Sequence, residues 1–372
     1  MSLLNVGIIG QSGFIGYHFA QYLRLHGDKI KVVPFDAAYF QNPNQLKLFV
    51  QQCDTIVHLA AMNRGPDDEV YATNVGLVEK LINALEQAKH TPHVIFSSSI
   101  QEERDNAYGR SKRDGARLLA AWAERNSASF TSLIIPNVFG PFGRPFHNSV
   151  VATFCHQLTH EQMPGIKVDA SLSLLPVQDL AREIFKAIEG AYDMPVVHLD
   201  VTAERRVSEI LNRLCEFKEW YFDRHIIPDL HGPFDTALFN TFRSFIEPGY
   251  FPVYPEVHTD DRGYLAEVLK ELSGGQVFFS LTKPGITRGN HFHMRKVERF
   301  FVIQGEAVIR LRRVGTDRII EYHVQGSRPS FVDMPVNYTH SITNIGTTDV
   351  LTLFWTNELF DPKDPDTFYE EV

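Results

Sequence analysis

Two groups of residues in this chain have the types and spacings of reaction centres. In the first, Tyr108-Gly109-Arg110-Ser111-Lys112, four positions along a helix would put Tyr108 and Lys112 on one face. A nearby ammonium favours the phenolate and lowers the pKa of a tyrosine, so Tyr108 could exchange a proton with a carbonyl or an alcohol near neutral pH. Ser99, the last residue of a serine triplet, could donate a hydrogen bond to the substrate oxygen as charge develops there.

The second group has the residue types of a metal site. His291 and His293 alternate along a predicted strand, so their side chains face the same side. Glu298 comes just before the next predicted strand, and His340 comes from a later one. Any one of the 16 histidines could be an ordinary buried polar group. Three imidazoles and a carboxylate at this spacing nevertheless predict a site for a divalent transition metal such as Zn²⁺.

A glycine loop near the start of the chain predicts a nucleotide site. Gly10, Gly13 and Gly16 follow a strand-like run and open a helix, where glycines let the backbone approach a pyrophosphate at the positive helix end. Asp36 follows the second predicted strand. Its carboxylate could accept hydrogen bonds from the adenosine ribose, which favours NAD over NADP, although an ordinary loop aspartate would look the same.

The elements that must position these residues change character along the chain. Strand and helix patterns alternate through the first part, which predicts a Rossmann-type, doubly wound parallel sheet. The predicted strands are 5–9, 31–35, 55–59, 93–96 and 132–136, and the predicted helices are 14–25, 71–88 and 108–125. The serine triplet 97–99 then lies at the carboxyl edge of the sheet, where such folds bind ligands.

A proline-rich stretch at 247–255 separates this part from a β-rich remainder. Beyond it, short β-rich runs without a good helix between them predict a small β-barrel or double sheet. These runs are 276–281, 299–303, 307–311, 319–324 and 350–355. The predicted fold is therefore α/β plus all-β, with domains at 1–247 and 248–372.

Composition narrows the function classes. The 372 residues, 44% hydrophobic and 22% charged, are ordinary for a globular protein of about two domains. A net charge of −9 disfavours nucleic-acid binding. We expect no membrane span and no secretory signal, because no long apolar run and no basic leader is found. Cys53, Cys155 and Cys215 lack a metal or disulfide spacing, which suits the cytoplasm.

The order of glycine loop, serine strand end and Tyr-x-x-x-Lys pair resembles the extended short-chain dehydrogenase/reductase family over about residues 5–245. The resemblance implies that Tyr108 is the acid, Lys112 its modulator and Ser99 the partner of the substrate carbonyl. The cofactor residues that it implies, the phosphate loop first, are Gly10, Ser12, Gly13, Phe14, Ile15, Gly16, Asp36, Leu59, Ala60, Ala61, Asn74, Tyr108, Lys112, Pro136 and Asn137.

Members of that family act on nucleotide sugars as reductases, epimerases or dehydratases. Dehydratases usually carry an acidic pair directly after the serine or threonine strand end. Here Ile100-Gln101 follows Ser99, which favours simple reduction of a ketone.

The later part resembles the cupin superfamily in the spacing Gly285-x5-His291-x-His293-x4-Glu298-x6-Gly305 and in Pro335-x-Asn337-x2-His340-x3-Asn344. The second motif departs from the pattern, because Asn337 stands where a glycine is usual and Gly326 sits at a non-standard distance.

Within the cupins, this part is similar to nucleotide-sugar 3,5-epimerases, whose arginines hold the diphosphate and whose histidine after Arg-Gly-x is a base. The substrate residues that we expect are Arg262, Gln276, Arg288, Asn148 and Tyr338. His291 thereby has two predicted roles, metal ligand and base, and a metal-bound nitrogen cannot also take a proton. Tyr338, Glu298 and His323 stay open as alternative bases.

A ketone reductase and an epimerase make chemical sense on one chain, because a proton beside a ketone is acidic only until the ketone is reduced. End to end, the chain resembles bifunctional enzymes of bacterial capsular polysaccharide synthesis. The resemblance implies a homodimer built through the cupin, with Zn²⁺ there and NADPH in the reductase. The implied substrate is a UDP-4-keto sugar and the implied product UDP-2-acetamido-2,6-dideoxy-L-talose. Asp36 would repel the phosphate of NADP, so NADH could also serve.

Two other functions fit the same residues. One is a nucleotide-sugar isomerase that retains NAD and uses the cupin only for dimerisation. The other is a non-catalytic, NAD-sensing module with a metal-stabilised cupin.

Overall fold

The computed structural model describes residues 3–192, 194–255, 257–260, 263–266, 269, 272, 275–358 and 361–372, with the backbone alone for 257–260, 263–266 and 276. The chain forms two compact units. The first comprises 1–139, 143–150 and 170–206, and the second comprises 140–142, 151–169 and 207–372.

The first unit is built on a six-stranded parallel sheet in the order β2-β1-β3-β4-β5-β8. Its strands are β1 (Leu4–Ile9), β2 (Ile30–Val33), β3 (Thr55–His58), β4 (His93–Ser99), β5 (Phe130–Ile135) and β8 (Val196–His198). Its helices are α1 (Phe14–Arg24), α2 (Pro43–Val50), α3 (Asp67–Ala88), α4 (Ala107–Asn126) and α6 (Val177–Ile188), with short 3₁₀ turns η1 (Ala37–Gln41) and η2 (Ile100–Glu103). A small sheet of β6 (Asn137–Phe139), β7 (Ser171–Pro176) and β9 (Ala203–Arg206) completes the unit.

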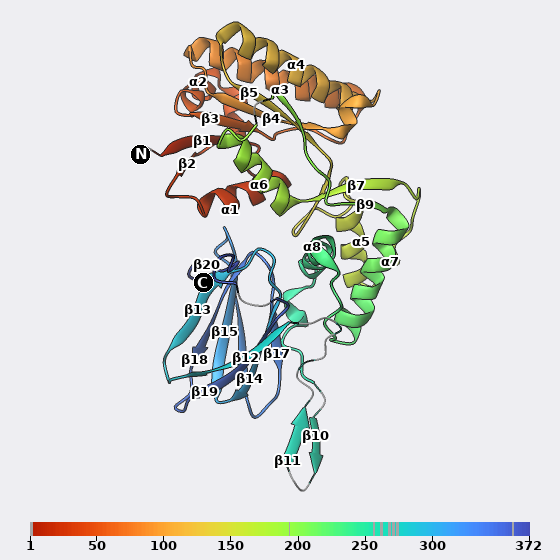
Figure 1. The fold of residues 1–372 in the computed structure, drawn as a ribbon, viewed down its shortest axis with the longest axis vertical. Helices are drawn as coiled ribbons and strands as arrows, with labels where there is room; N and C mark the ends of the chain where they lie inside the picture. Colours follow the sequence, from red (N-terminus) through yellow and green to blue (C-terminus); the bar gives the residue numbers. More distant parts are fainter. Residues whose placement is uncertain are drawn as a thin grey trace. The chain divides into compact units, whose positions relative to one another are not determined.

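Helices cover both faces of the parallel sheet (Figure 1). Phe19 of α1 and Leu180 of α6 join one apolar core, whereas Leu81 of α3 and Trp122 of α4 join the core on the opposite face. The near-continuous apolar strands of this sheet reflect burial on both sides. Strand β2 lies on one side of β1 and β3 lies on the other, so the order of the strands reverses at β1. Such folds bind ligands at the carboxyl ends of the strands beside this point, which are β1 and β3 here.

The second unit combines helices with two antiparallel sheets. Its helical elements are α5 (Val150–Thr159), α7 (Val207–Phe217), η3 (Lys218–Asp223), α8 (Gly232–Arg243) and η4 (Pro248–Tyr250). One sheet has the order β12-β19-β14-β17 and the other β16-β15-β18-β13-β20. The strands are β12 (Gln276–Thr282), β13 (Thr287–Phe292), β14 (Glu298–Gln304), β15 (Glu306–Arg313), β16 (Ile319–Gln325), β17 (Phe331–Met334), β18 (Tyr338–Asn344), β19 (Val350–Thr356) and β20 (Phe368–Tyr369), besides the hairpin of β10 (Val257–Asp260) and β11 (Gly263–Ala266).

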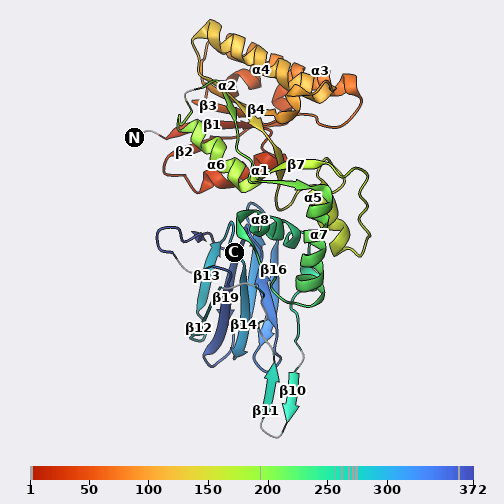
Figure 2. The ribbon, with the colours of Figure 1, turned by 45° about the vertical axis from the view of Figure 1, so that its right-hand side comes forward.

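A buried polar network ties the helices of this unit to its strands. Helix α8 lies at one end of these strands (Figure 2). Arg299 of β14 makes a bidentate ion pair with Asp333 of β17, at 2.7 and 3.0 Å. Tyr221 of η3 donates its hydroxyl hydrogen bond to the same carboxylate. Arg243 of α8 donates to the Tyr221 hydroxyl oxygen and, over 2.9 Å, to the Met334 carbonyl. Because breaking a buried charge pair leaves an uncompensated charge, this network fixes α8 against the end of β17.

The predicted fold class is confirmed, with a Rossmann-like sheet first and antiparallel sheets after it. Six strands of the second unit, β10, β11, β13, β17, β18 and β20, were not among the predicted β-rich runs. The metal motif had nevertheless placed His291 and His340 on strands, and these are β13 and β18. The domain boundary at 247/248 stays a prediction, while α7 and α8 group with the second unit. Among the described residues, no helix combines the length and apolar composition that crossing a bilayer requires.

Candidate active site and metal centre

The glycine loop joins β1 to α1 in a turn that excludes side chains. Gly10 has a φ of +93°, and the Gly13 amide donates to its carbonyl over 3.0 Å. A Cβ on Gly16 would lie 2.1 Å from the Gly10 oxygen, so the helix can start this close to the strand only with glycine there. Ser12 and Gly13 are exposed at the start of α1, and Phe14 and Ile15 are half-buried. This arrangement fits a diphosphate at the helix end.

Asp36 is exposed after β2 and begins η1. Its Oδ1 accepts a hydrogen bond from the Ala38 amide over 2.8 Å, which fixes the direction of the carboxylate. The predicted ribose contact therefore rests on the other carboxylate oxygen.

Asn74 of α3 holds the loop that follows β3. Its Oδ1 accepts from the Met62 amide over 2.6 Å, and its Nδ2 donates to the Met62 carbonyl over 2.8 Å and to the Ser111 hydroxyl over 3.0 Å. Leu59, Ala60 and Ala61 precede this anchor and are half-buried. In the structure Asn74 thus links the loop that follows β3 to the helix that carries Tyr108 and Lys112, a link that its position in the sequence did not reveal.

Helix α4 presents Tyr108 and Lys112 in its first turns. Asn106 caps the helix by accepting a hydrogen bond from the Gly109 amide over 2.7 Å. The Lys112 Nζ donates to the Ser97 carbonyl over 2.7 Å and lies 5.7 Å from the centre of the Tyr108 ring. Its side chain is 3% exposed. The predicted pair is therefore brought together at the carboxyl end of β4.

Burial sets the charges of this pair. It raises the pKa of Tyr108 to about 12 and lowers the pKa of Lys112 to about 7. The helical spacing predicted that the ammonium of Lys112 would lower the pKa of Tyr108. The structure corrects that expectation, because both groups lose solvent and the lysine is itself pushed toward its neutral form.

Four predicted residues of the first unit remain: Ser99 ends β4, Pro136 lies between β5 and β6, Asn137 begins β6, and Asn148 precedes α5. Ser99 is buried, and its hydroxyl accepts from the Gln101 amide over 3.1 Å. Pro136 is buried, and Asn137 donates to the Ser173 carbonyl over 3.1 Å. Asn148 is exposed, with a φ of +56°, and donates to the Asn63 carbonyl over 2.7 Å.

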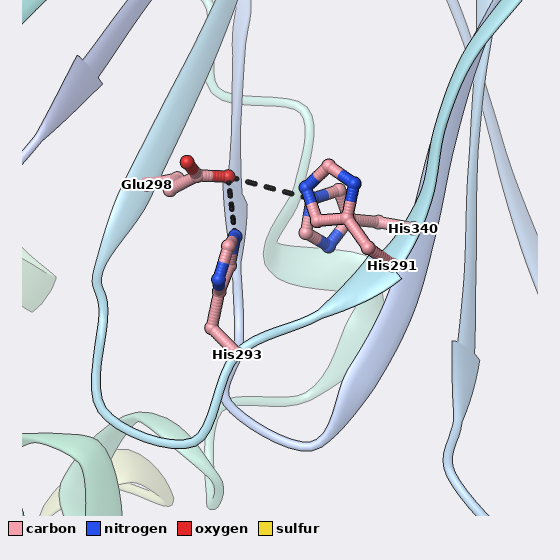
Figure 3. A group of neighbouring side chains, drawn as sticks. All are labelled: His291, His293, Glu298 and His340. Atoms are coloured by element: carbon pink, nitrogen blue, oxygen red, sulfur yellow. Dashed lines mark ion pairs between the residues drawn. The ribbon is translucent and has the colours of Figure 1, made fainter. Parts of the chain in front are cut away.

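The four predicted metal ligands converge in the second unit (Figure 3). Ligand atoms of His291, His293, Glu298 and His340 all lie within 4.8 Å of one another. Glu298 Oε2 is 3.0 Å from His293 Nε2 and 3.4 Å from His340 Nε2. Ligands at about 2.1 Å from a tetrahedral ion stand about 3.4 Å apart, so these separations fit one cation.

Three of these ligand atoms are buried without a hydrogen-bond partner in the described chain: His293 Nε2, Glu298 Oε2 and His340 Nε2. The opposite nitrogen of His293, Nδ1, faces the Asp366 carbonyl at 2.6 Å, which leaves Nε2 for a ligand. Because buried polar atoms are normally satisfied, the cluster fits a metal ion bound between them.

The charge states also suit a cation. Burial lowers the pKa of His291 to about 4, helped by the neighbouring imidazoles of His340 and His293. Burial tends to raise the pKa of Glu298, but its close contacts with the imidazoles of His293 and His340 and their charge hold it well below its usual range. Burial opposes protonation of His293, yet its contact with Glu298 leaves its pKa raised. A divalent ion would displace that proton, because metal binding needs the free nitrogen.

Two local backbone features aim the histidines. The register between β13 and β18 shifts between Gly289 and His291, which marks a bulge that re-aims the side chain. Gly289 has a φ of +99°, and a Cβ there would lie 2.7 Å from the His340 carbonyl oxygen. Asn337 has a φ of +57°, a left-handed conformation that asparagine tolerates. Asn337 can therefore adopt the backbone conformation of the glycine that is usual at this position of the second motif.

The structure also refines two sequence positions. Glu298 is the first residue of β14, not the residue before it, and His293 lies just past the end of β13. His323 is exposed on β16 and lines a cavity with Glu306 and Arg328 that none of the four ligands lines. Tyr338 begins β18, two residues before His340, and packs against Phe142 with ring centres 6.0 Å apart.

Two of the predicted substrate residues cannot be placed by their side chains. Arg262 lies outside the described residues, and of Gln276 only the backbone is described. Arg288 is exposed, and its guanidinium donates to the Thr282 hydroxyl over 3.1 Å and to the Leu281 carbonyl over 3.2 Å.

Known families match both parts of the chain. Residues 6–196 match the NAD dependent epimerase/dehydratase family, and residues 258–368 match the polysaccharide biosynthesis C-terminal domain. The chain belongs to the NAD dependent epimerase/dehydratase family. The predicted resemblance to reductases of this family is thereby confirmed.

Relatives of full length share both parts. A UDP-2-acetamido-2,6-beta-L-arabino-hexul-4-ose reductase of Pseudomonas aeruginosa is 33% identical over 371 residues, 98% of each chain. The crystal structure of the capsular polysaccharide assembling protein CapF of Staphylococcus aureus has a TM-score of 0.64 at 35% identity, covering 99% of this chain and 100% of that one. A UDP-glucuronic acid 4-epimerase of Bacillus cereus, with a TM-score of 0.51 at 19% identity over 58% of this chain and 83% of its own, shares the fold.

Proposed function

We propose that this protein is a bifunctional nucleotide-sugar enzyme, both an isomerase and an oxidoreductase. Its cupin part epimerises a UDP-4-keto-6-deoxy-N-acetylhexosamine at carbon 3, and its Rossmann part reduces the ketone at carbon 4. The product is UDP-2-acetamido-2,6-dideoxy-L-talose, a precursor for capsular or related polysaccharide. The full-length likeness to a hexulose reductase and to a capsule-assembling protein supports this substrate class.

The reduction is carried by the pairing of Tyr108 and Lys112 at the carboxyl end of β4. A bound NAD(P)H supplies the hydride. Tyr108 donates the proton to the carbonyl oxygen, and Ser99 donates a hydrogen bond to the same oxygen. Lys112 stabilises the phenolate that remains, which a pKa of about 7 allows it to do in its charged form near neutral pH.

The cofactor choice rests on Asp36. Full-length resemblance implies NADPH, whereas a carboxylate at this position repels a 2′-phosphate and hydrogen-bonds a ribose. We therefore expect this chain to accept NADH as well as NADPH.

The order of the two steps follows from carbonyl chemistry. The proton on carbon 3 is acidic because its loss gives an enolate that spreads charge onto the carbon-4 oxygen. Reduction removes that carbonyl and with it the acidity. Epimerisation therefore comes first, and reduction makes its outcome permanent.

In the cupin part, we assign Zn²⁺ to His291, His293, Glu298 and His340. Zinc at such a site can polarise a carbonyl oxygen or simply stabilise the fold. With these four residues as ligands, Tyr338 is the remaining proton carrier among the three alternatives, because His323 faces a different cavity. Its place on β18, two residues from His340, supports this assignment.

We further propose that two copies associate through strand β12 and its exposed side chains. Within the described chain, β12 is the edge strand of its sheet, and edge strands readily pair with another chain. Its side chains Val277, Phe279 and Leu281 are 51, 69 and 56% exposed. Replacing Phe279 by Lys should convert a dimer to a monomer in light scattering. An unchanged mass would place the contact elsewhere, and a wild-type monomer would refute the dimer.

One incubation tests the proposed chemistry. The protein is given a UDP-4-keto-6-deoxy-N-acetylhexosamine in heavy water, with and without NADH or NADPH, and the products are read by mass spectrometry. We expect one deuterium at carbon 3 in both cases, and stoichiometric loss of reduced cofactor in the second. Deuterium without cofactor consumption would refute the reduction and leave the epimerisation. An isomerised sugar without deuterium or cofactor loss would favour the cofactor-retaining isomerase whose cupin only dimerises. If the substrate stays unchanged and neither signal appears, the non-catalytic alternative is favoured.

A further inference from the structure

The last residues of the chain wrap around the metal cluster. We name residues 364–370 the C-terminal strap. Asp366, 3% exposed, accepts hydrogen bonds with its carboxylate from the amides of Met294 at 3.2 Å, Arg295 at 3.0 Å and Lys296 at 2.9 Å. These three residues belong to the four-residue loop between His293 and Glu298. One buried carboxylate therefore fixes the segment that joins two of the four ligands.

The main chain of the same residue holds the imidazole of His293. The Asp366 carbonyl lies 2.6 Å from His293 Nδ1, so the bond is Nδ1–H to oxygen and Nε2 keeps its lone pair for a cation. Asp366 itself has a φ of +42°, a conformation uncommon for a residue with a side chain. The three amide contacts of its carboxylate offset the strain of that conformation and fix the position of the carbonyl.

The strap also contacts residues beside the other two histidines of the cluster, His291 and His340. Strand β20 pairs with β13, where Tyr369 stands opposite His291 and Phe368 opposite Phe292. Thr339, the residue before His340, donates its hydroxyl hydrogen bond to the Glu370 carbonyl. The guanidinium of Arg295 contacts Asp364 at 3.0 Å, which adds an ion pair between loop and strap.

We propose that the C-terminal strap is the outer shell of the metal centre and that Asp366 is its positioning residue. The strap sets the affinity of the site for Zn²⁺ by orienting His293 and by fixing the loop that leads to Glu298. The inference rests on the proposed metal centre and goes beyond it, because the strap supplies no ligand atom. Outer-shell partners of this kind change metal affinity by about 10–100-fold when they are removed.

The test measures the Zn²⁺ dissociation constant of the full chain by competition with a chelator of known affinity. Asp366→Ala should weaken Zn²⁺ binding by about 10–100-fold, and Asp366→Asn, which keeps the volume and one acceptor oxygen, by less. The matched control is Asp361→Ala. Asp361 lies on the same C-terminal segment, and its carboxylate accepts from the Lys363 amide at 2.8 Å, outside the loop. Its replacement should leave the affinity unchanged.

A second readout separates positioning from simple stabilisation. Protein loaded with Co²⁺ reports the ligand geometry through its visible absorption. Asp366→Asn should change that spectrum at a temperature where circular dichroism shows the variant folded.

The outcomes discriminate between the proposals. Wild-type affinity in both variants at Asp366 would overturn the strap inference and leave the metal centre intact. The same holds if Asp366→Ala does not fold and Asp366→Asn binds Zn²⁺ as the wild type does. A wild-type protein that binds no Zn²⁺ would refute the metal centre itself.

Discussion

The two candidate sites respond to burial in opposite ways. At Lys112 in the first unit, burial lowers the pKa to about 7, and no carboxylate among the described residues opposes this shift. At Glu298 in the second unit, burial pushes the pKa up, but His293 and His340 overcome it and keep the carboxylate ionised. The ammonium of Lys112 is thus only partly charged near neutral pH, whereas the carboxylate of Glu298 is kept ionised by the two histidines beside it.

This difference indicates which kind of ligand each site would bind. Lys112 would regain its proton when an anionic or strongly polar ligand binds nearby, as a dinucleotide does. The metal cluster already has an ionised carboxylate and imidazole nitrogens without hydrogen-bond partners, so a cation completes it. One site therefore suits proton exchange with a bound substrate, and the other suits permanent ligation.

The largest effect is expected from a substitution that stops ketone reduction and leaves epimerisation intact. Replacing Tyr108 by Phe removes the proton donor and should slow ketone reduction by about 10²–10⁴-fold, measured as loss of NAD(P)H absorbance. Deuterium exchange at carbon 3 should continue. Tyr71→Phe is the matched control, because that hydroxyl contacts Asp114 at 2.9 Å on the outer helices. Equal loss of both activities in Tyr108→Phe would contradict two separate sites.

The second effect tests ligation. Replacing His293 by Ala removes a ligand, so Zn²⁺ affinity should fall by more than the roughly 100-fold expected of an outer-shell loss. Zinc content after dialysis, measured by atomic emission, should fall with it. His323→Ala, an exposed histidine of the same unit, should keep its zinc. Full zinc content in His293→Ala would remove that residue from the ligand set.

The third effect concerns the buried lysine in cofactor-free protein. Its folded pKa of about 7 lies below the ordinary 10.5, so the folded state binds fewer protons between these values. The destabilisation is complete below pH 7 and is relieved as the pH rises toward 10.5. Between pH 6.5 and 9.5 the wild type should gain on the order of 3 kcal/mol relative to Lys112→Met in urea unfolding. Parallel pH profiles would show that Lys112 keeps an ordinary pKa.

The smallest effect is on cofactor choice. Replacing Asp36 by Arg exchanges a repulsive charge for an attractive one, and the ratio of kcat/KM for NADPH to that for NADH should rise by about 10-fold. Asp28→Arg changes an exposed charge just before β2 and serves as the control. An unchanged ratio would remove Asp36 from cofactor discrimination.

How well the sequence predicted each site depended on how local its contacts are. Tyr108 and Lys112 lie one helical turn apart, so spacing alone placed them on one face. The partner of Lys112, the Ser97 carbonyl, comes from a neighbouring strand and carries no side-chain signal. The rise in the pKa of Tyr108 was also missed, because burial outweighs the neighbouring charge and burial is not visible in spacing.

The candidate metal cluster was predicted through its residue types and motif spacing, although two of its strands were not among the runs predicted from the apolar pattern. The strands β13 and β18 are rich in Thr, Ser, Asn and Gly, so neither shows the apolar alternation that marks a strand. Asp366 could not be predicted at all. It lies 73 residues from His293 and belongs to no recognised motif, so only folding brings the two together.

The sequence by itself determined the order of the two folds, the glycine loop, the Tyr108–Lys112 pair and the four residues of the candidate metal cluster, because these depend on periodicity, residue type and motif spacing. Tertiary structure alone decided which buried groups keep their charge, how Asn74 joins the loop after β3 to α4, and which residues surround the four residues of the cluster. Those properties arise from desolvation and from hydrogen bonds between distant segments, which come into being only when the chain is packed.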